Sequence, residues 1–183
     1  MIELPRRAVL LIALVCASGV LAQTPAAPAE VMAELPGVRL QGSGRLRFLG
    51  LRIYDAHLWA GAQPVTADWS ATPFALELLY ARDLKGEQIA ERSLAEMKRQ
   101  GDIAAETAQR WLALMKQLFP DVKAGDRITG VNIPGVGARF FVNGALRGEP
   151  KDVHFARLFF GIWLSPRSSE PALREALLGH TAP

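Results

Sequence analysis

Two arginines at alternate positions, Arg45 and Arg47, stand in an apolar run that is rich in strand-forming residues. Alternate residues of a strand share one face of the sheet, so both guanidinium groups are expected on the same side. On a buried face they would need an anionic partner, and a guanidinium binds a carboxylate through two parallel hydrogen bonds. On an exposed face they would contact solvent or form internal salt bridges. The pattern therefore indicates a candidate site for an acidic ligand.

Three further polar residues are candidates for the same site. Strict alternation from Arg45 puts Tyr54 on the opposite face, whereas a bulge at Gly50 would bring it onto the arginine face. A plain core position is the alternative for Tyr54. Thr129 and Asn143 are weaker candidates, because hairpin and turn positions explain both residues.

Other kinds of chemistry find little support in the sequence. His57, His154 and His180 are far apart and have no second ligand at helical spacing, so we expect neither a metal site nor a cofactor. The glycines of residues 42–44 are not followed by the rest of a phosphate-binding loop. The acidic residues of the predicted helix 86–100, including Glu96, are interpreted as a solvated face, although carboxylates could still meet in three dimensions.

Strand and helix patterns alternate after Val38. A single long strand is expected over 45–60, with Gly50 as a bulge or bend in its middle. Other strands are predicted at 38–41, 74–80, 127–133 and 138–143. Helices are predicted at 86–100, 102–119, 153–164 and 168–179. This order of elements indicates an α+β fold.

The composition is that of one globular domain. The chain has 183 residues, of which 50% are hydrophobic and 21% charged, which excludes a disordered chain and a small disulfide-rich protein. The net charge is +3, and it is +2 without the 22 N-terminal residues, whose only charges are Glu3, Arg6 and Arg7. So small an excess makes nucleic acid an unexpected partner.

The N-terminal residues 1–22 have the pattern of a signal peptide. Arg6 and Arg7 precede an apolar run that ends in Val20-Leu21-Ala22, with small residues where a signal peptidase requires them. The run is shorter than the roughly 20 residues of a membrane span, so we expect cleavage, no stable membrane anchor afterwards, and a periplasmic or secreted protein. Residues 23–36, rich in Ala and Pro, are predicted to be a flexible linker before a domain at 37–183.

An ordered series of short motifs across Val38–Gly179 resembles the chalcone isomerase-like proteins of bacteria. The motifs are Leu40-x-Gly42-x-Gly44, Arg47-Phe48, Ile53-Tyr54-Asp55-Ala56-x-Leu58, Tyr80-x-Arg82, Glu91-Arg92-Ser93-x-x-Glu96-Met97, Phe119-Pro120-Asp121-Val122-Lys123-x-Gly125-Asp126, Phe140-Phe141-x-Asn143-Gly144, Phe159-Phe160-Gly161-Ile162-Trp163-Leu164 and Arg174-x-x-Leu177-Leu178-Gly179. The resemblance implies an open-faced β-sandwich, in which helices cover one face of a large antiparallel sheet with a ligand cleft between them.

The resemblance also bears on function, because the superfamily contains isomerases, fatty-acid-binding members and members without demonstrated catalysis. The catalytic tyrosine and asparagine of the isomerases fall at about Ile89 and Glu96. Because isoleucine cannot move a proton, the isomerase reaction of the plant enzymes is not expected here. In the fatty-acid-binding members a strand arginine and a tyrosine hold the carboxylate, which implies Arg45 or Arg47 together with Tyr54 here.

The sequence therefore favours an exported, non-catalytic protein that binds a small hydrophobic carboxylate, such as a fatty acid, between sheet and helices. One alternative is an isomerase or lyase on another substrate, which predicts a pocket residue with a strongly shifted pKa. Another is an interaction scaffold without a ligand, which predicts a filled cleft and an exposed apolar patch. The oligomeric state has no signature in the sequence.

Overall fold

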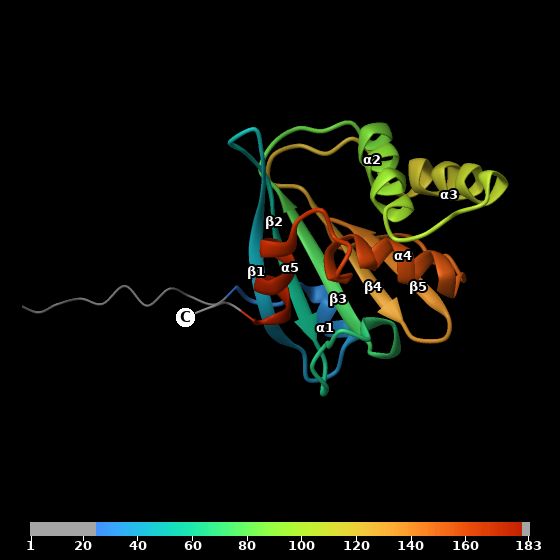
Figure 1. Cartoon of the computed structure of the whole chain (residues 1–183). Coiled ribbons are helices and arrows are strands. Elements are labelled where there is room, and N and C mark those ends of the chain that lie inside the picture. Colours follow the sequence, from blue (N-terminus) through green and yellow to red (C-terminus); the bar gives the residue numbers. More distant parts are fainter. Residues whose placement is uncertain (1–24, 181–183) are drawn as a thin grey trace, which may run out of the picture.

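A six-stranded antiparallel sheet is the frame of the fold (Figure 1). The computed structural model describes residues 25–180. Each strand pairs with its neighbours in sequence, in the order β1-β2-β3-β4-β5-β6. The strands are β1 Arg39–Phe48, β2 Leu51–Ala60, β3 Phe74–Tyr80, β4 Arg127–Ile133, β5 Gly137–Val142 and β6 Ala145–Gly148.

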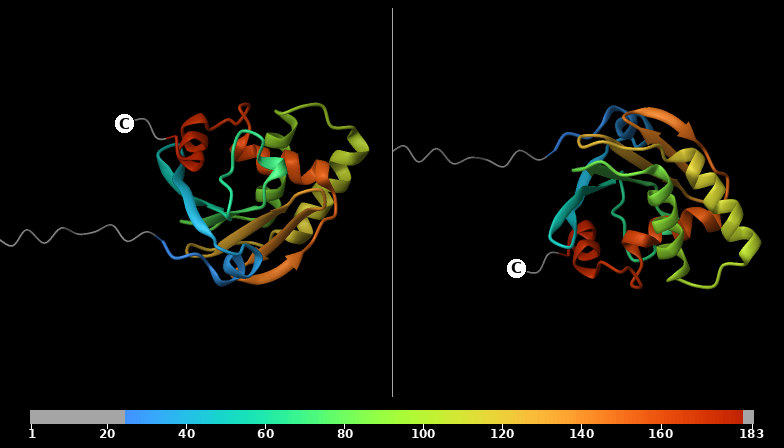
Figure 2. Two further views of the ribbon diagram at one scale, coloured as in Figure 1. Left: turned by 90° about the horizontal axis from the view of Figure 1, so that it is seen from below. Right: turned by 90° about the horizontal axis from the view of Figure 1, so that it is seen from above.

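Four helices cover one face of this sheet, and a short fifth helix lies on the other face (Figure 2). On the covered face are α2 Gly86–Lys98, α3 Ala105–Leu118, α4 Val153–Leu164 and α5 Pro171–Leu178, and a 3₁₀ turn, η1, spans Trp69–Ala71. Phe74, Phe140, Phe155 and Phe160 are fully buried between the sheet and these helices. The predicted α+β fold, with helices on one face of a large antiparallel sheet, is thereby confirmed.

The helix boundaries follow local chemistry. The Asp152 carboxylate accepts a hydrogen bond of 2.9 Å from the Phe155 backbone N–H and so begins α4 as its N-cap. Pro171 stands in the first turn of α5, where its missing N–H costs nothing. Gly179 ends α5 in the left-handed conformation at φ 77°.

The single strand expected over 45–60 is wrong, because the chain reverses there. Leu49 and Gly50 form a turn with φ values of 49° and 78°, and β1 and β2 pair on either side of it as a hairpin. Glycine adopts such angles readily, whereas leucine does so at a cost. The apolar run continues through the turn, so composition alone conceals the reversal.

Gly42 and Gly44, which separate the predicted strands 38–41 and 45–60, lie inside the single strand β1. α5 crosses this strand so closely that a Cβ added to Gly42 would stand 2.2 Å from the carbonyl oxygen of Ala176. A side chain added to Gly44 would meet Leu173 at 2.5 Å. These glycines therefore allow a helix to pack on the strand rather than breaking the strand.

The flexible linker expected over 23–36 is wrong for its second half, which holds the helix α1, Ala29–Glu34. Val31 and Leu35 are buried in a small second core with Trp59, Val131 and Phe141, on the sheet face opposite the other helices. Val31 and Leu35 are four residues apart, so a helix brings both to the sheet, and this burial outweighs the neighbouring prolines. The predicted signal peptide, 1–22, lies outside the described residues. Between residues 25 and 180 no helix has the length and apolarity that crossing a membrane requires.

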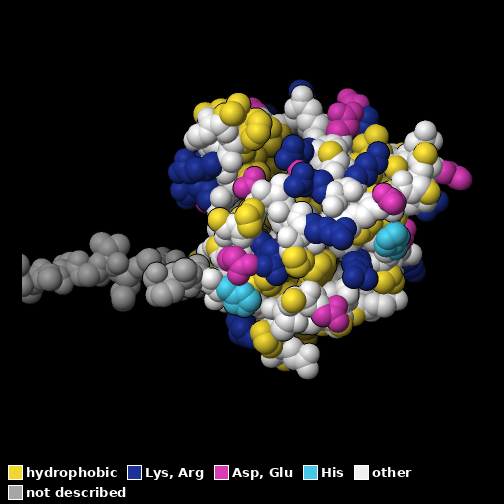
Figure 3. All heavy atoms as spheres, in the orientation of Figure 1, with side chains coloured by type: hydrophobic (Ala, Val, Ile, Leu, Met, Phe, Trp, Pro, Cys, Tyr) yellow, Lys and Arg dark blue, Asp and Glu magenta, His cyan; other side chains and the backbone are white. Residues whose placement is uncertain are grey.

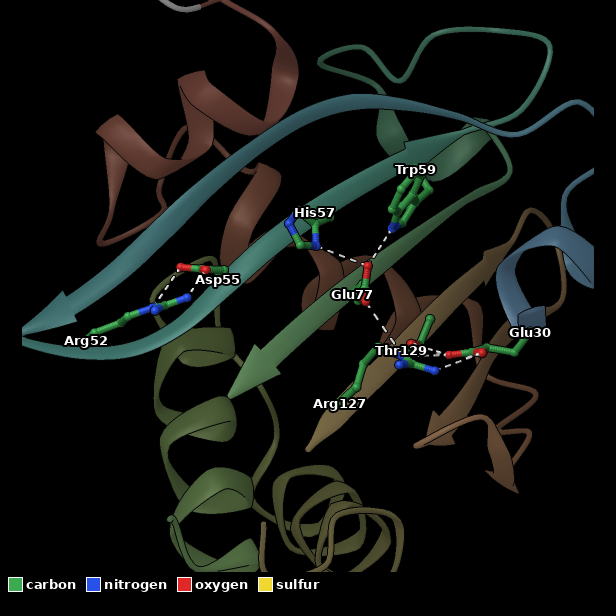
Figure 4. A network of polar contacts seen from close by, with 8 residues as sticks. All are labelled: Glu30, Arg52, Asp55, His57, Trp59, Glu77, Arg127 and Thr129. Atoms are coloured by element: carbon green, nitrogen blue, oxygen red, sulfur yellow. Dashed lines mark hydrogen bonds and ion pairs between the residues drawn. The ribbon is translucent and has the colours of Figure 1, made fainter. Parts of the chain in front are cut away.

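A buried ion pair holds α1 to the sheet. Arg127 donates from Nε and Nη2 to the two Glu30 carboxylate oxygens, at 3.0 and 3.2 Å, and Thr129 Oγ1 donates to Glu30 Oε1 at 3.0 Å (Figure 4). Burial alone would raise the pKa of Glu30, but the hydrogen bonds and charge of Arg127 outweigh it and lower the pKa below 4.5. The ionised carboxylate therefore contributes to folding stability.

Replacing Glu30 by glutamine is expected to lower the free energy of unfolding by about 2 kcal/mol at neutral pH, since the charged hydrogen bonds are lost. The lowered pKa makes this contribution complete above about pH 4.5, and it is lost as the pH falls further and the wild-type carboxylate takes up a proton. Urea unfolding at a series of pH values should show the two proteins converging in acid.

An exposed carboxylate gives the matched control. Glu106→Gln, in the first turn of α3, should change the stability by no more than about 0.5 kcal/mol at any of these pH values. A Glu30→Gln deficit that stays constant down to the lowest pH would contradict the assigned ion pair.

Candidate functional site

A cavity of about 300 Å³ lies between the sheet and the helices α2 and α4. Its wall is mostly aliphatic and aromatic, with contributions from four strands and both helices: Leu46, Leu78, Ile89, Ile128, Phe159 and Ile162. The volume is at the lower end of the range for small-molecule sites in proteins. An apolar wall of this kind favours a hydrophobic ligand.

Two tyrosine hydroxyls are the polar side-chain groups of the part of the wall that the sheet contributes. Tyr54 of β2 and Tyr80 of β3 are cross-strand partners, and their rings meet edge to face with centroids 5.8 Å apart. Tyr54 Oη accepts a hydrogen bond of 2.9 Å from Trp163 Nε1. Within the described residues neither hydroxyl donates to a protein acceptor, so both O–H groups are available to a molecule in the cavity.

Burial keeps both phenols neutral. Desolvation is the main reason that the pKa of each tyrosine lies well above its ordinary value. Glu170 and Glu96 raise the pKa of Tyr54 further, and the hydrogen bond from Trp163 opposes the rise only in part. At physiological pH the two groups are therefore hydrogen-bond donors, suited to a carbonyl or carboxylate oxygen, and not proton acceptors.

An ion pair on α2 supplies the charge at the cavity. Arg92 Nη2 lies 2.7 Å from Glu96 Oε1, and Arg99 Nε lies 3.4 Å from the other carboxylate oxygen. Both Arg92 and Glu96 line the cavity. Two guanidinium groups thus share the Glu96 carboxylate, and a second carboxylate, that of Glu170, also lines the cavity. Among the described residues that line the cavity, Arg92 is the one lysine or arginine.

Of the five predicted site residues, Tyr54 lines the cavity and the two arginines do not. Arg45 donates from Nε to Asp55 Oδ1 at 2.7 Å on the exposed face of the hairpin, and Arg47 donates to the carbonyl of Gly50 at 3.3 Å. The expected meeting of these arginines with Tyr54 is therefore wrong. The physical reason is the hairpin, which pairs Leu46 with Tyr54 and Arg45 with Asp55, on opposite faces of the sheet.

Thr129 and Asn143 also lie away from the cavity. Thr129 is fully buried on the opposite face, where it donates to Glu30. Asn143 stands in the turn between β5 and β6 at φ 50°, and its side-chain oxygen accepts a hydrogen bond of 2.8 Å from the Arg127 backbone N–H. Asn143 therefore has the turn position that was its alternative from the sequence, whereas the hydrogen bond of Thr129 to α1 was not expected.

Three residues of the site were missed from the sequence: Tyr80, Arg92 and Trp163. Tyr80 ends a strongly apolar strand, and a cross-strand partner can be recognised only once the register is known. Arg92 is three residues from Ile89 and four from Glu96, so helical spacing puts all three on one side of α2. The positions that the resemblance implied, Ile89 and Glu96, do line the cavity. The interpretation of Glu96 as solvated is wrong, since it is only 8% exposed.

The raised pKa values can be tested directly, because Tyr54 and Tyr80 are the two tyrosines of the whole chain. We expect little ultraviolet absorption from tyrosinate until the folded protein unfolds in alkali, whereas the chain in urea should titrate near pH 10. By linkage, stability is unaffected by these groups below about pH 10 and falls above it. Reversible titration of either tyrosine near pH 10 in the folded protein would contradict the buried placement.

Comparison with known proteins agrees with this architecture. The chalcone isomerase-like family model matches residues 26–179. A solved fatty-acid binding protein of Arabidopsis thaliana has the same fold, with a TM-score of 0.61 and 16% sequence identity, over 79% of this chain and 88% of that chain. An uncharacterised protein of Haemophilus influenzae is 30% identical over 113 residues, or 60% of this chain. The chain spans 53% of that relative's length. With nearly all of the described residues matched, the chain belongs to the chalcone isomerase-like family.

Proposed function

We propose that the cavity binds a small hydrophobic carboxylate, such as a fatty acid, without altering it chemically. The observation that carries this proposal is a largely apolar cavity in which the sheet presents two neutral phenol donors. The solved protein of the same fold that binds fatty acids supports the choice of ligand class. An interaction scaffold without a ligand would have a filled cleft, so the cavity counts against that alternative.

The proposed complex places the hydrocarbon chain against the apolar wall and the carboxylate between Tyr54 and Arg92. A buried carboxylate needs both hydrogen bonds and a positive charge. The Tyr54 hydroxyl would donate one hydrogen bond, and the guanidinium of Arg92, whose charge acts on that phenol, would supply the charge. Glu96 would keep Arg99 as its partner while Arg92 turns to the ligand.

Tyr54→Phe is expected to weaken fatty-acid binding about tenfold, since it removes one hydrogen bond to a charged acceptor and keeps the ring. Arg92→Gln should weaken binding of the acid about fivefold and leave the methyl ester almost unaffected, because the ester has no charge for the guanidinium to neutralise. Isothermal titration calorimetry with matched acid and ester measures both differences.

Two further variants serve as controls. Arg45→Gln, on the exposed face, should bind both ligands as the wild type does. Ile89→Trp, which fills the cavity from α2, should abolish binding of acid and ester alike. Equal affinities of the wild type and Ile89→Trp would show that the ligand binds elsewhere, and the proposal would be withdrawn.

Glu96 supports a second candidate function, an isomerase or lyase, because a carboxylate that is almost fully buried lines the cavity. Such a group could accept a proton from a bound substrate. The ligand recovered from a long incubation distinguishes the two functions. An unchanged molecule supports binding, whereas a chemically altered one, formed by the wild type and not by Glu96→Gln, would establish catalysis.

We also propose that the protein is exported, on the pattern of residues 1–22. Expression of the full chain in a bacterial host should then yield a protein in the periplasm or medium whose N-terminus is Gln23, as measured by intact mass. Replacing both Ala22 and Val20 by arginine should block this cleavage, because a signal peptidase requires small residues there. An intact N-terminus in the cytoplasm would contradict export.

A further inference from the structure

The tip of the β1–β2 hairpin exposes three large hydrophobic side chains within four residues. Phe48 is 60% exposed, Leu49 86% and Leu51 53%. The other exposed large hydrophobics of the described chain are scattered singly, at Met32, Val136, Leu146 and Val153. Figure 3 shows hydrophobic side chains gathered at this end of the hairpin, with a group of Lys and Arg side chains beside them. Such clusters on soluble proteins mark interaction surfaces.

The turn at the hairpin tip has a backbone conformation that its residue type disfavours. Leu49 keeps a left-handed backbone conformation that leucine disfavours, in a turn that the Arg47 hydrogen bond to Gly50 supports. An asparagine or glycine at position 49 would fit the turn better and would be more soluble. A leucine at this point is therefore unfavourable for the isolated protein and suits contact with an apolar medium.

Basic side chains flank the tip on both strands. Arg45 and Arg52 both pair with the carboxylate of Asp55, and Arg47 is the cross-strand partner of Arg52. Three positive charges against one negative charge leave an excess of two, and Arg47 forms no ion pair with a described carboxylate. Apolar side chains at a tip, with arginines set just behind them, match the depth profile of an anionic bilayer, hydrocarbon below and phosphate above.

The same hairpin forms part of the cavity. Leu46 and Phe48 of β1 line it together with Ile53 and Tyr54 of β2. Phe48 is both mostly exposed and part of the wall, so it stands at the mouth of the cavity. A surface that covers the tip therefore also lies beside the entrance.

We propose that the β1–β2 hairpin tip docks the protein on an anionic lipid bilayer, with Phe48, Leu49 and Leu51 in the hydrocarbon interface and Arg47 and Arg52 at the headgroups. A hydrophobic ligand then passes between the bilayer and the cavity with little exposure to water. The docking stands on the hairpin alone, whereas the transfer of a ligand rests on the proposed function.

A bilayer fits this tip better than a second copy of the chain does. Two tips in contact would bring together two groups that each carry an excess of positive charge. Three side chains at the end of a narrow hairpin are also too few for the roughly 1,000 Å² that a stable protein interface buries. Insertion into a bilayer needs only a few apolar side chains together with charge attraction.

The test is flotation with vesicles of phosphatidylcholine that contain or lack phosphatidylglycerol. Leu49→Asn should weaken binding to the anionic vesicles about tenfold, because it removes a leucine that the bilayer would bury. The asparagine fits the turn and leaves the net charge unchanged. The matched control is Val136→Asn, in the turn between β4 and β5 at the opposite end of the sheet, which should bind as the wild type does. Arg47→Gln with Arg52→Gln should weaken binding on anionic vesicles and remove its dependence on salt.

A local probe separates the tip from the apolar N-terminal residues of the full chain. Leu49→Trp adds a tryptophan at the tip, and brominated lipids should quench its emission while the emission of Val136→Trp stays unchanged. Quenching of Leu49→Trp together with loss of flotation in Leu49→Asn supports the docking. Equal flotation of wild type and Leu49→Asn, or association of the protein with itself through the tip in place of vesicle binding, overturns it.

Ligand binding measured without vesicles keeps the two proposals apart. Leu49→Asn should bind fatty acid as tightly as the wild type does, but should take it up from anionic vesicles about tenfold more slowly. If fatty acid does not bind while the vesicle results hold, the proposed function fails and the docking stands. If fatty acid binds and both proteins take it up at equal rates, the role of the hairpin in transfer is excluded.

Discussion

The pairing of β1 with β2 decides what every other part of the molecule can do. This register places Leu46 opposite Tyr54 and Arg45 opposite Asp55, so one face of the hairpin is apolar and the other is charged. A shift of β1 by one residue would send its arginines onto the core face and Leu46 into solvent. The close approach of α5 at Gly42 and Gly44, where no side chain fits, resists such a shift. The β1–β2 register therefore places the cavity residues of the hairpin, its exposed ion pairs and its apolar tip.

The chemistry of the cavity depends on how little of it is polar. The wall around Tyr54 and Tyr80 excludes water and so raises the pKa of both phenols, and their hydroxyls keep donor capacity that no described protein group uses. The charged groups of the wall are Arg92 and Glu96 of α2, which pair with each other, and Glu170 before α5. Neutral donors in an apolar wall, with a guanidinium that can exchange its partner, are complementary to an acidic molecule with a hydrocarbon chain. Because both phenols stay protonated, neither can remove a proton from a bound molecule, and this favours binding over catalysis.

On the opposite face of the sheet, charged side chains join α1 to the strands and line no part of the described cavity. Glu30, Glu77, Thr129 and Arg127 join α1 to the middle of β3 and β4, and His57 and Trp59 of β2 complete the network at Glu77 (Figure 4). Buried polar groups are tolerable only when they are paired, and here several strands contribute to the pairing. Strands β2 to β4, which carry the cavity on one face, are thus fixed to one another on the other face.

The sequence by itself determined the class of fold, most of the strands and helices and the family resemblance, and it named Tyr54 as a candidate without deciding its face. Those features depend on local periodicity, on capping residues such as Asp152 and Gly179, and on the order of short motifs. The tertiary structure alone decided that Arg45 and Arg47 face solvent, that Tyr80, Arg92 and Trp163 line the cavity, and that α1 replaces a linker. The reason is physical: a turn inside an apolar run leaves its composition unchanged but reverses the chain. Which side chains meet then depends on cross-strand register and on contacts between residues far apart in sequence.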